Sequence, residues 1–211
     1  MILPIGSSGN IWRRAQRLAV HLLKDRRGVA AVEFAFVAPL LVVMFFGTVE
    51  FSAAIAIKRN VTNMARTVSD LTSQAAVITD TDFANFFAAS SGIMMPYSAT
   101  PITVTVSLLY VDPSSGQVRV EWSKGYNTAK LAAGVPPPVS TPSGLISRDA
   151  NNNVLANQYL IYSHVTYAYT NPTLVVLKSS ITLTDDSYTR PRQTTCVFYP
   201  SVPSPNVCPT S

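Results

Sequence analysis

The chain has 211 residues, of which 47% are hydrophobic and only 13% are charged. This composition excludes a disordered chain, and two cysteines with two histidines exclude a disulfide-dense scaffold or a four-cysteine zinc finger. The formal net charge of +5 would favour a nucleic-acid partner only if the basic residues gathered on the folded part of the chain.

The whole positive excess lies in the first 28 residues. That segment holds six basic residues and one acidic residue, Asp25, whereas the remaining 183 residues carry ten of each sign. The folded part therefore has no basic residues in excess, and the sequence predicts no nucleic-acid partner.

A long apolar stretch follows this basic segment directly. From Gly28 to Ile57 the only ionisable side chains are Glu33 and Glu50, and no polar face appears at helical spacing, as it would in the core helix of a soluble protein. About 20 helical residues, at about 1.5 Å each, cross a hydrocarbon core of about 30 Å. Residues 29–57 are therefore predicted to form a transmembrane helix.

The flanking charges predict the orientation of this helix. More basic residues precede the apolar stretch than follow it, and the more basic side of a span stays in the cytoplasm. Residues 1–28 are thus expected to form a cytoplasmic leader, and residues 58–211 an exported head.

Two carboxylates in the apolar stretch need an explanation, because an ionised carboxylate in the bilayer core costs several kcal/mol unless it is paired or near the interface. Glu33 and Glu50 are 17 residues apart, about 25 Å along a helix, so both can lie near opposite rims of the membrane. For Glu50, contact with the lipid headgroups and a role in helix register both stay open.

Glu33 has a second explanation. Cleavage after Gly28 would create a new amino terminus at Val29, about one helical turn from Glu33. The amine and the carboxylate could then neutralise each other between adjacent subunits, which would set the register of neighbouring helices in the membrane.

These residues resemble a known processing signal. A basic leader, Gly28, small apolar residues, Glu33 and a long apolar helix are similar to a type IV prepilin signal. The string over residues 26–41, followed by residues 47–51, resembles the TadE/TadG-like proteins of the tight-adherence (Tad or Flp) pilus system. The resemblance covers about residues 26–75.

The resemblance implies a minor pilin or pseudopilin that a dedicated aspartyl prepilin peptidase cleaves. Gly28 would precede the scissile bond, Val29 would begin the mature chain, and Glu33 would be its fifth residue. Phe34 stands where a Tyr commonly follows the Glu in the main pilins of such systems, and the exported part is far larger than theirs. The resemblance therefore favours an accessory subunit of a bacterial inner membrane, with a periplasmic C-terminal domain and other pilin and pseudopilin subunits as partners.

An ordinary secretory signal peptide is an alternative. Its apolar region would be residues 34–49, which is a little long, and residues 54–56 would offer a cleavage site of small residues. That interpretation leaves Gly28 and Glu33 unexplained.

The exported part predicts helices followed by strands. Apolar residues between Val61 and Ala75 follow i, i+3, i+4 spacing, so the first helix is expected to continue to about Ser73. Two cap candidates, Thr79 and Thr81, predict a second helix over Thr79–Ser90.

A period of two then predicts strands over residues 104–110, 118–122, 159–169 and 181–183, with a turn at 112–116 and a loop at 134–144. The predicted fold class is α+β, in which the long N-terminal helix continues into the periplasm and packs on a small antiparallel sheet, as in a pilin.

Several polar and aromatic residues in the strand region are possible functional groups. The pair Asp185-Asp186 is interpreted as a turn that ends a short strand rather than as a cation site, and His164 as a histidine on a polar face. Four tyrosines suggest either a carbohydrate or adhesin contact surface or, as we favour, half-exposed strand residues: Tyr159, Tyr162, Tyr167 and Tyr169.

The only cysteines, Cys196 and Cys208, lie in a Pro-rich tail. In an oxidising periplasm we expect them to form a structural disulfide that closes a C-terminal loop, since a redox-active pair is more often CxxC at the start of a helix.

No nucleophile, base and orienting group occur together in a recognisable motif, so the sequence predicts no enzyme, no cofactor and no metal site. The predicted function is a minor pilin-like subunit for assembly of a Tad-type pilus. Two alternatives are a single-pass, membrane-anchored periplasmic binding protein and an exported protein with a cleaved signal peptide. The mature N-terminus distinguishes the three: Val29, Met1 or about Ile57.

Overall fold

The structure is a computed structural model that describes residue 20 and residues 27–170, 179–201 and 208. Most of the predicted leader, residues 1–28, lies outside the described residues. The chain divides into two compact units, Met1–Val49 and Glu50–Ser211, which are treated separately below. We call the second unit the head.

Helix α2 (Arg27–Ser73) runs through 47 residues and belongs to both units. Its extent confirms the helix predicted from about Ala30 to Ser73. Pro39 lies inside the helix and has no N–H to donate, so one intrahelical hydrogen bond is missing there. Within the head, the predicted apolar stripe of α2 is the buried one, and Met64 is a plain core residue of that stripe.

Helix α3 (Asp80–Ser91) confirms the second predicted helix. Of the two cap candidates, Thr79 is the N-cap: its hydroxyl accepts from the backbone N–H of Asp82, and the Asp82 carboxylate accepts from the backbone N–H of Thr79. This reciprocal capping box satisfies donors that the first helical turn cannot pair internally.

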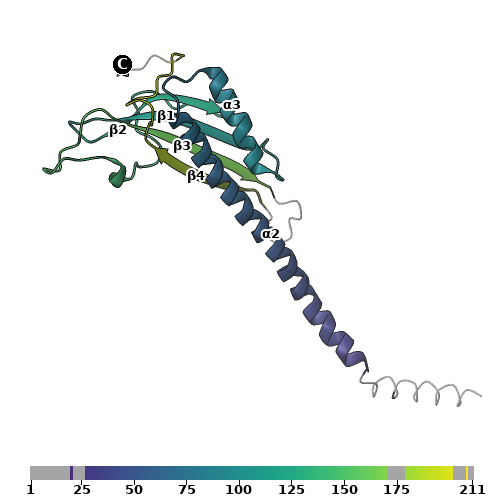
Figure 1. Ribbon diagram of the computed structural model, residues 1–211. Helices are drawn as coiled ribbons and strands as arrows, with labels where there is room; N and C mark the ends of the chain where they lie inside the picture. Colours follow the sequence, from purple (N-terminus) through teal and green to yellow (C-terminus); the bar gives the residue numbers. More distant parts are fainter. Residues whose placement is uncertain (1–19, 21–26, 171–178, 202–207, 209–211) are drawn as a thin grey trace, which may run out of the picture. The chain divides into compact units, whose positions relative to one another are not determined.

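The sheet has four antiparallel strands in the order β2-β1-β3-β4 (Figure 1). They are β1 (Ile102–Val111), β2 (Val118–Tyr126), β3 (Gln158–Tyr169) and β4 (Ile181–Thr189). The α+β class and all four predicted strands are confirmed. Strand β4 extends well past the predicted end at residue 183.

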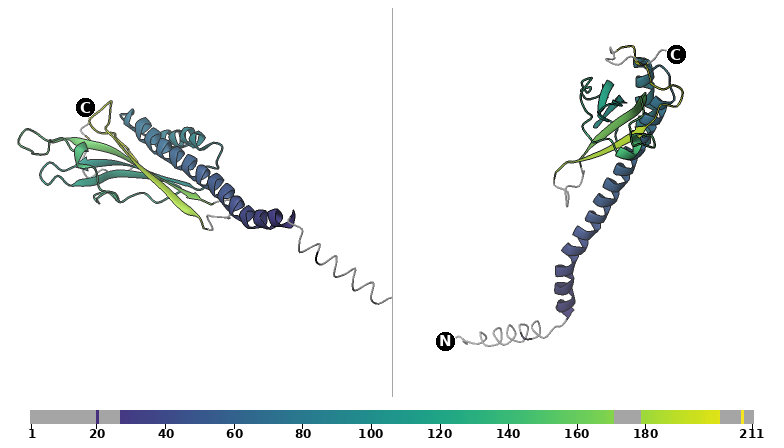
Figure 2. Two further views of the ribbon diagram at one scale, coloured as in Figure 1. Left: turned by 90° about the horizontal axis from the view of Figure 1, so that it is seen from below. Right: turned by 90° about the vertical axis from the view of Figure 1, so that its left-hand side faces the viewer.

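Each face of the sheet buries apolar side chains. One face packs against α3 and the head part of α2, which lie on the same side of the sheet (Figure 2). The other face carries a second apolar cluster that the long connection between β2 and β3 covers with Leu131, Leu145, Ile146 and Val154. The sheet is therefore the middle layer of the head.

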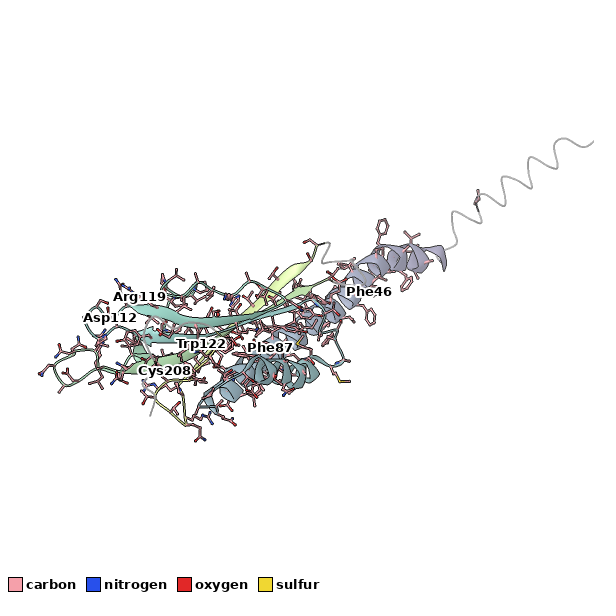
Figure 3. All side chains as sticks on the ribbon, turned by 90° about the horizontal axis from the view of Figure 1, so that it is seen from above. Phe46, Phe87, Asp112, Arg119, Trp122 and Cys208 are labelled. Atoms are coloured by element: carbon pink, nitrogen blue, oxygen red, sulfur yellow. A yellow bond between two sulfur atoms is a disulfide. The ribbon has the colours of Figure 1, made fainter. Side chains whose placement is uncertain are left out.

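A β-bulge in β2 corrects the simple alternation that the sequence predicts for this strand. Leu108 pairs with Trp122 and Leu109 with Val120, so Glu121 is skipped in the register. The extra residue turns Val120 and Trp122 to opposite faces of the sheet, although they are two residues apart. Trp122 consequently lies on the side of α3, as Figure 3 shows, where it contacts Phe83 at 5.8 Å between ring centroids.

The C-terminal segment crosses the ends of both helices, and we call residues 192–201 the strap. The backbone of Phe198 donates to Ala76 and accepts from Ile78, and Trp122 donates its indole N–H to the carbonyl of Val197 at 2.8 Å. Cys196 and Cys208 are both buried and form a disulfide with 5.6 Å between their Cα atoms. The strap thereby completes the core around the start of α3.

Removing the disulfide is expected to destabilise the head. Closing a loop of this length stabilises a protein by about 3 kcal/mol in the chain-entropy model, so the double variant C196S/C208S should lose about that much free energy of unfolding. Denaturant unfolding of the full chain in detergent micelles measures the loss. Reductant should lower the stability of the wild type and leave the double variant unchanged, whereas equal stabilities of the two proteins would contradict the expectation.

Asp80 joins three parts of the head. Its carboxylate accepts from Lys124 on β2 at 2.5 Å, from the Tyr199 hydroxyl of the strap at 2.6 Å and from Ser201 at 3.0 Å. The hydrogen bond from Lys124, followed by those from Tyr199 and Ser201, lowers the pKa of Asp80 to about 2.

This pKa predicts an acid-sensitive contribution to stability. Because the folded state lowers the pKa of Asp80 from 3.8 to about 2, the carboxylate stabilises the fold above about pH 4 and loses this effect as the pH falls toward 2. Urea unfolding at pH 5 and pH 2 should therefore show a smaller pH dependence for D80N than for the wild type. Lys124→Met should reduce the pH dependence as well, and an unchanged dependence in both variants would exclude this network as its source.

Candidate functional site

The first unit of the chain exposes apolar side chains on every side of α2. Between Gly28 and Val49 the large hydrophobic residues are exposed, with Phe36 at 81%. Among the described residues one helix, Gly28–Ser73, is long and apolar enough to cross a membrane, and none of its most apolar window, of mean hydropathy 2.4, is buried in the protein. A core helix of a soluble protein would be covered instead.

Gly28 lies in the first turn of α2, beside Val29. A Cβ atom placed on Gly28 would meet no atom within 4 Å, so the fold itself makes no demand for glycine at this position. A requirement for glycine here would therefore come from recognition by another molecule.

Glu33 shares a face of α2 with Val29. The two residues are four positions apart, about 6 Å along the helix axis, and both side chains are exposed. Their neighbours on this face, Phe36 and Val37, are apolar and exposed as well. The carboxylate therefore lies in an apolar surface that the described head does not cover.

Glu50 is in a different environment, because it is the first residue of the head and only 1% exposed. Burial, followed by the negative charge of Glu50, raises the pKa of Tyr169 at the end of β3. One and two turns further along α2, Ala54 and Ile57 are part of the head core. The structure thus places Glu50 inside the head, and the exposed apolar part of α2 ends at Val49.

Asp185 and Asp186 correct the predicted turn, since both lie in the middle of β4. Consecutive side chains of a strand point to opposite faces. Asp185 contacts Lys58 at 3.2 Å and accepts from Thr62, both on α2. Asp186 accepts from the Tyr162 hydroxyl at 2.6 Å and contacts Nδ1 of His164 at 2.8 Å. These partners allow two adjacent carboxylates in a strand, and their opposite directions prevent joint binding of one cation.

His164 lies on the sheet face away from the helices, as predicted for a polar-face histidine. Its Nε2 atom is 3.1 Å from the Thr166 hydroxyl, which gives the order hydroxyl, imidazole and carboxylate. A catalytic triad also needs a substrate cleft and an oxyanion site. The two cavities found near described residues are lined by other side chains.

One of these cavities holds about 150 Å³ beside Gln158 and Arg190, and the other about 320 Å³ between α3 and β2, near Phe87 and Tyr126. Over the described part of the chain, no group of three His, Cys, Asp or Glu residues lies close enough to hold a metal ion.

The four tyrosines form neither a contact surface nor a half-exposed strand face, because all of them are buried. Three face the helices and one lies under the connection between β2 and β3: Tyr159, Tyr167 and Tyr169, and Tyr162, respectively. The sequence interpretation missed this because it did not foresee that elements would cover both faces of the sheet.

An α+β head that continues from a single apolar helix defines a single-pass membrane protein. Residues 28–70 match the family model described as TadE-like protein, which confirms the predicted resemblance over this segment and associates the chain with membrane proteins related to the Tad pilus. No curated protein and no solved structure matches the chain.

Proposed function

We propose that this protein is a minor pilin-like subunit that takes part in assembling a Tad-type pilus after a prepilin peptidase cleaves it between Gly28 and Val29. The observation that carries the proposal is the position of the TadE-like match. It begins at Gly28, the residue predicted to precede the cleaved bond, and includes the whole exposed apolar segment with Glu33.

The chemistry of assembly in this proposal is the packing of apolar helices. The exposed side chains of residues 28–49 contact lipid before assembly and other pilin or pseudopilin subunits afterwards. In the membrane, the Glu33 carboxylate and the new amino group of Val29 are each costly alone, and a pair between adjacent subunits relieves both costs. Glu33 would thereby set the axial position of one helix against the next.

The proposed topology puts the N-terminus in the cytoplasm and the head in the periplasm, where a disulfide such as Cys196–Cys208 persists. The proposed partners are the membrane, the prepilin peptidase and other subunits of the same pilus system.

Gly28→Ala tests the processing step. Since a Cβ atom at this position meets no neighbour, and Ala favours helix over Gly, the variant should fold normally and remain as the full-length precursor. N-terminal sequencing of protein extracted from membranes of the native host measures this, and the wild type should begin at Val29.

Gly92→Ala is the matched control for this variant. Gly92 also has open space around its missing Cβ and ordinary helical φ, so this variant should be processed like the wild type. Normal processing of the Gly28 variant, or a wild-type N-terminus at Met1 or near Ile57, would overturn the peptidase assignment.

Glu33→Gln tests the assembly step. The substitution keeps the shape of the side chain and removes its charge, so the chain should still be cleaved and inserted, but its co-purification with other pilus subunits should fall about tenfold, for a lost interaction of about 1.4 kcal/mol. Glu33→Asp keeps the charge and should restore part of the association. Wild-type association of the Gln variant would remove the role of Glu33 in helix register.

A further inference from the structure

Helix α2 and strand β4 run side by side in the head. Lys58 donates to the carbonyl of Thr184, and eleven residues later the Ser69 hydroxyl lies 2.7 Å from the hydroxyl of Thr189. Eleven helical residues advance about 16 Å and five strand residues about 16 Å, so the two elements keep the same level along this whole contact.

Extending this register downward brings Glu50 level with Ile181, the first residue of β4. Eight helical residues before Lys58 correspond to about 12 Å, and three to four strand residues cover the same distance. The raised pKa of Tyr169 agrees with this, because Tyr169 pairs with Ile181 and is influenced by the charge of Glu50.

The end of the sheet that lies level with Glu50 is the one where β1 and β4 begin and β2 and β3 end. Figure 1 shows that α3 also ends toward this side of the head. We call this end the base of the head and define it by Phe51, Ile55, Met95, Tyr97, Tyr126 and Tyr169. Met95 is placed here because Tyr97, two residues further on, is close enough to Tyr169 to influence its pKa.

The base exposes large apolar side chains. Met95 is 76% exposed, and Phe51, Ile55 and Tyr126 are exposed as well. Its one described carboxylate, Glu50, is buried, and the nearest cation along α2, Lys58, lies about 12 Å further from Val49 and is paired with Asp185. The base is therefore apolar and aromatic, with its ionic groups covered or further up the head.

We propose that the base of the head is a lipid-contact surface that lies in the headgroup layer of the outer leaflet. The exposed apolar part of α2, residues 28–49, has 22 residues and spans about 33 Å, against about 30 Å for the hydrocarbon core. The next residue, Glu50, is already level with the base. No spacer is left between the span and the head, so the headgroup layer, about 5–7 Å thick, is where the base lies.

The side chains of the base suit this layer. Tyrosine is enriched where membrane and water meet, because its ring prefers apolar surroundings and its hydroxyl prefers water. Met95 and Phe51 lose contact with water when lipid covers them. The proposal rests on insertion of residues 28–49 in the membrane and is independent of pilus assembly.

Site-directed fluorescence in vesicles tests the proposal. Because Cys196 and Cys208 are paired, a single introduced cysteine can be labelled with an environment-sensitive dye under non-reducing conditions. The full chain with Met95→Cys is placed in phosphatidylcholine vesicles that contain a lipid with a doxyl quencher near its headgroup. Leu155→Cys, at an exposed apolar residue (45%) of the connection between β2 and β3, is the matched control, and Phe36→Cys reports insertion of the span.

The label at position 95 should be quenched at least threefold more strongly than the label at position 155, and the label at position 36 should be quenched by a doxyl group deeper in the chain. Equal, weak quenching at 95 and 155 together with strong quenching at 36 would overturn the proposal while leaving the span intact. Protection of position 95 from aqueous iodide without quenching by the lipid would overturn it too, since protein would then cover the base. Absence of quenching at 36 would overturn the insertion on which the proposal rests.

Discussion

Helix α2 exposes apolar side chains on all sides over residues 28–49 and buries one stripe of side chains from Glu50 onward, and the rest of the structure depends on this change. An all-round apolar helix is stable only where no water reaches it, whereas a one-sided stripe needs a folded partner. The stripe through Ile57, Met64 and Val68 supplies the surface on which the sheet and α3 build their core. The same helix is therefore both an anchor and the foundation of the head.

The head holds its layers together by contacts that join distant parts of the chain. Lys58 and Thr62 on α2 contact Asp185 on β4, and Asp80 at the start of α3 links β2 with the strap. Exposed ion pairs of this kind each add little stability, but they fix which elements lie against one another. The buried disulfide then closes the strap over the start of α3. Most of the stability itself comes from the apolar faces that these contacts align.

The sequence predicts what depends on local periodicity and fails where partners are distant. Helix and strand periods located α2, α3 and the four strands, and Thr79 with Asp82 marked the start of α3, because each signal lies within a few residues. The continuation of β4 through Asp185 and Asp186 was missed, since their partners lie more than 20 residues away on β3 and more than 120 residues away on α2. The bulge at Glu121 and the burial of four tyrosines likewise depend on the assembled layers. Of the candidate site, the sequence located Gly28, Val29 and Glu33 by spacing, but it did not show that Glu50 is enclosed by the head.

The two glutamates of α2 show how the fold divides the work between this chain and its surroundings. An ionised carboxylate near a membrane has to be hydrated, enclosed by polar partners or paired with a cation. For Glu50 the head supplies the enclosure, since the residue is buried where β3 ends and α2 enters the core. Glu33 lies about 25 Å away, too far for the head to reach it, and is exposed among apolar side chains. Its charge therefore has to be balanced by groups at the other rim of the membrane, and an amino group at Val29 on a neighbouring helix would meet that need at the depth where Glu33 lies.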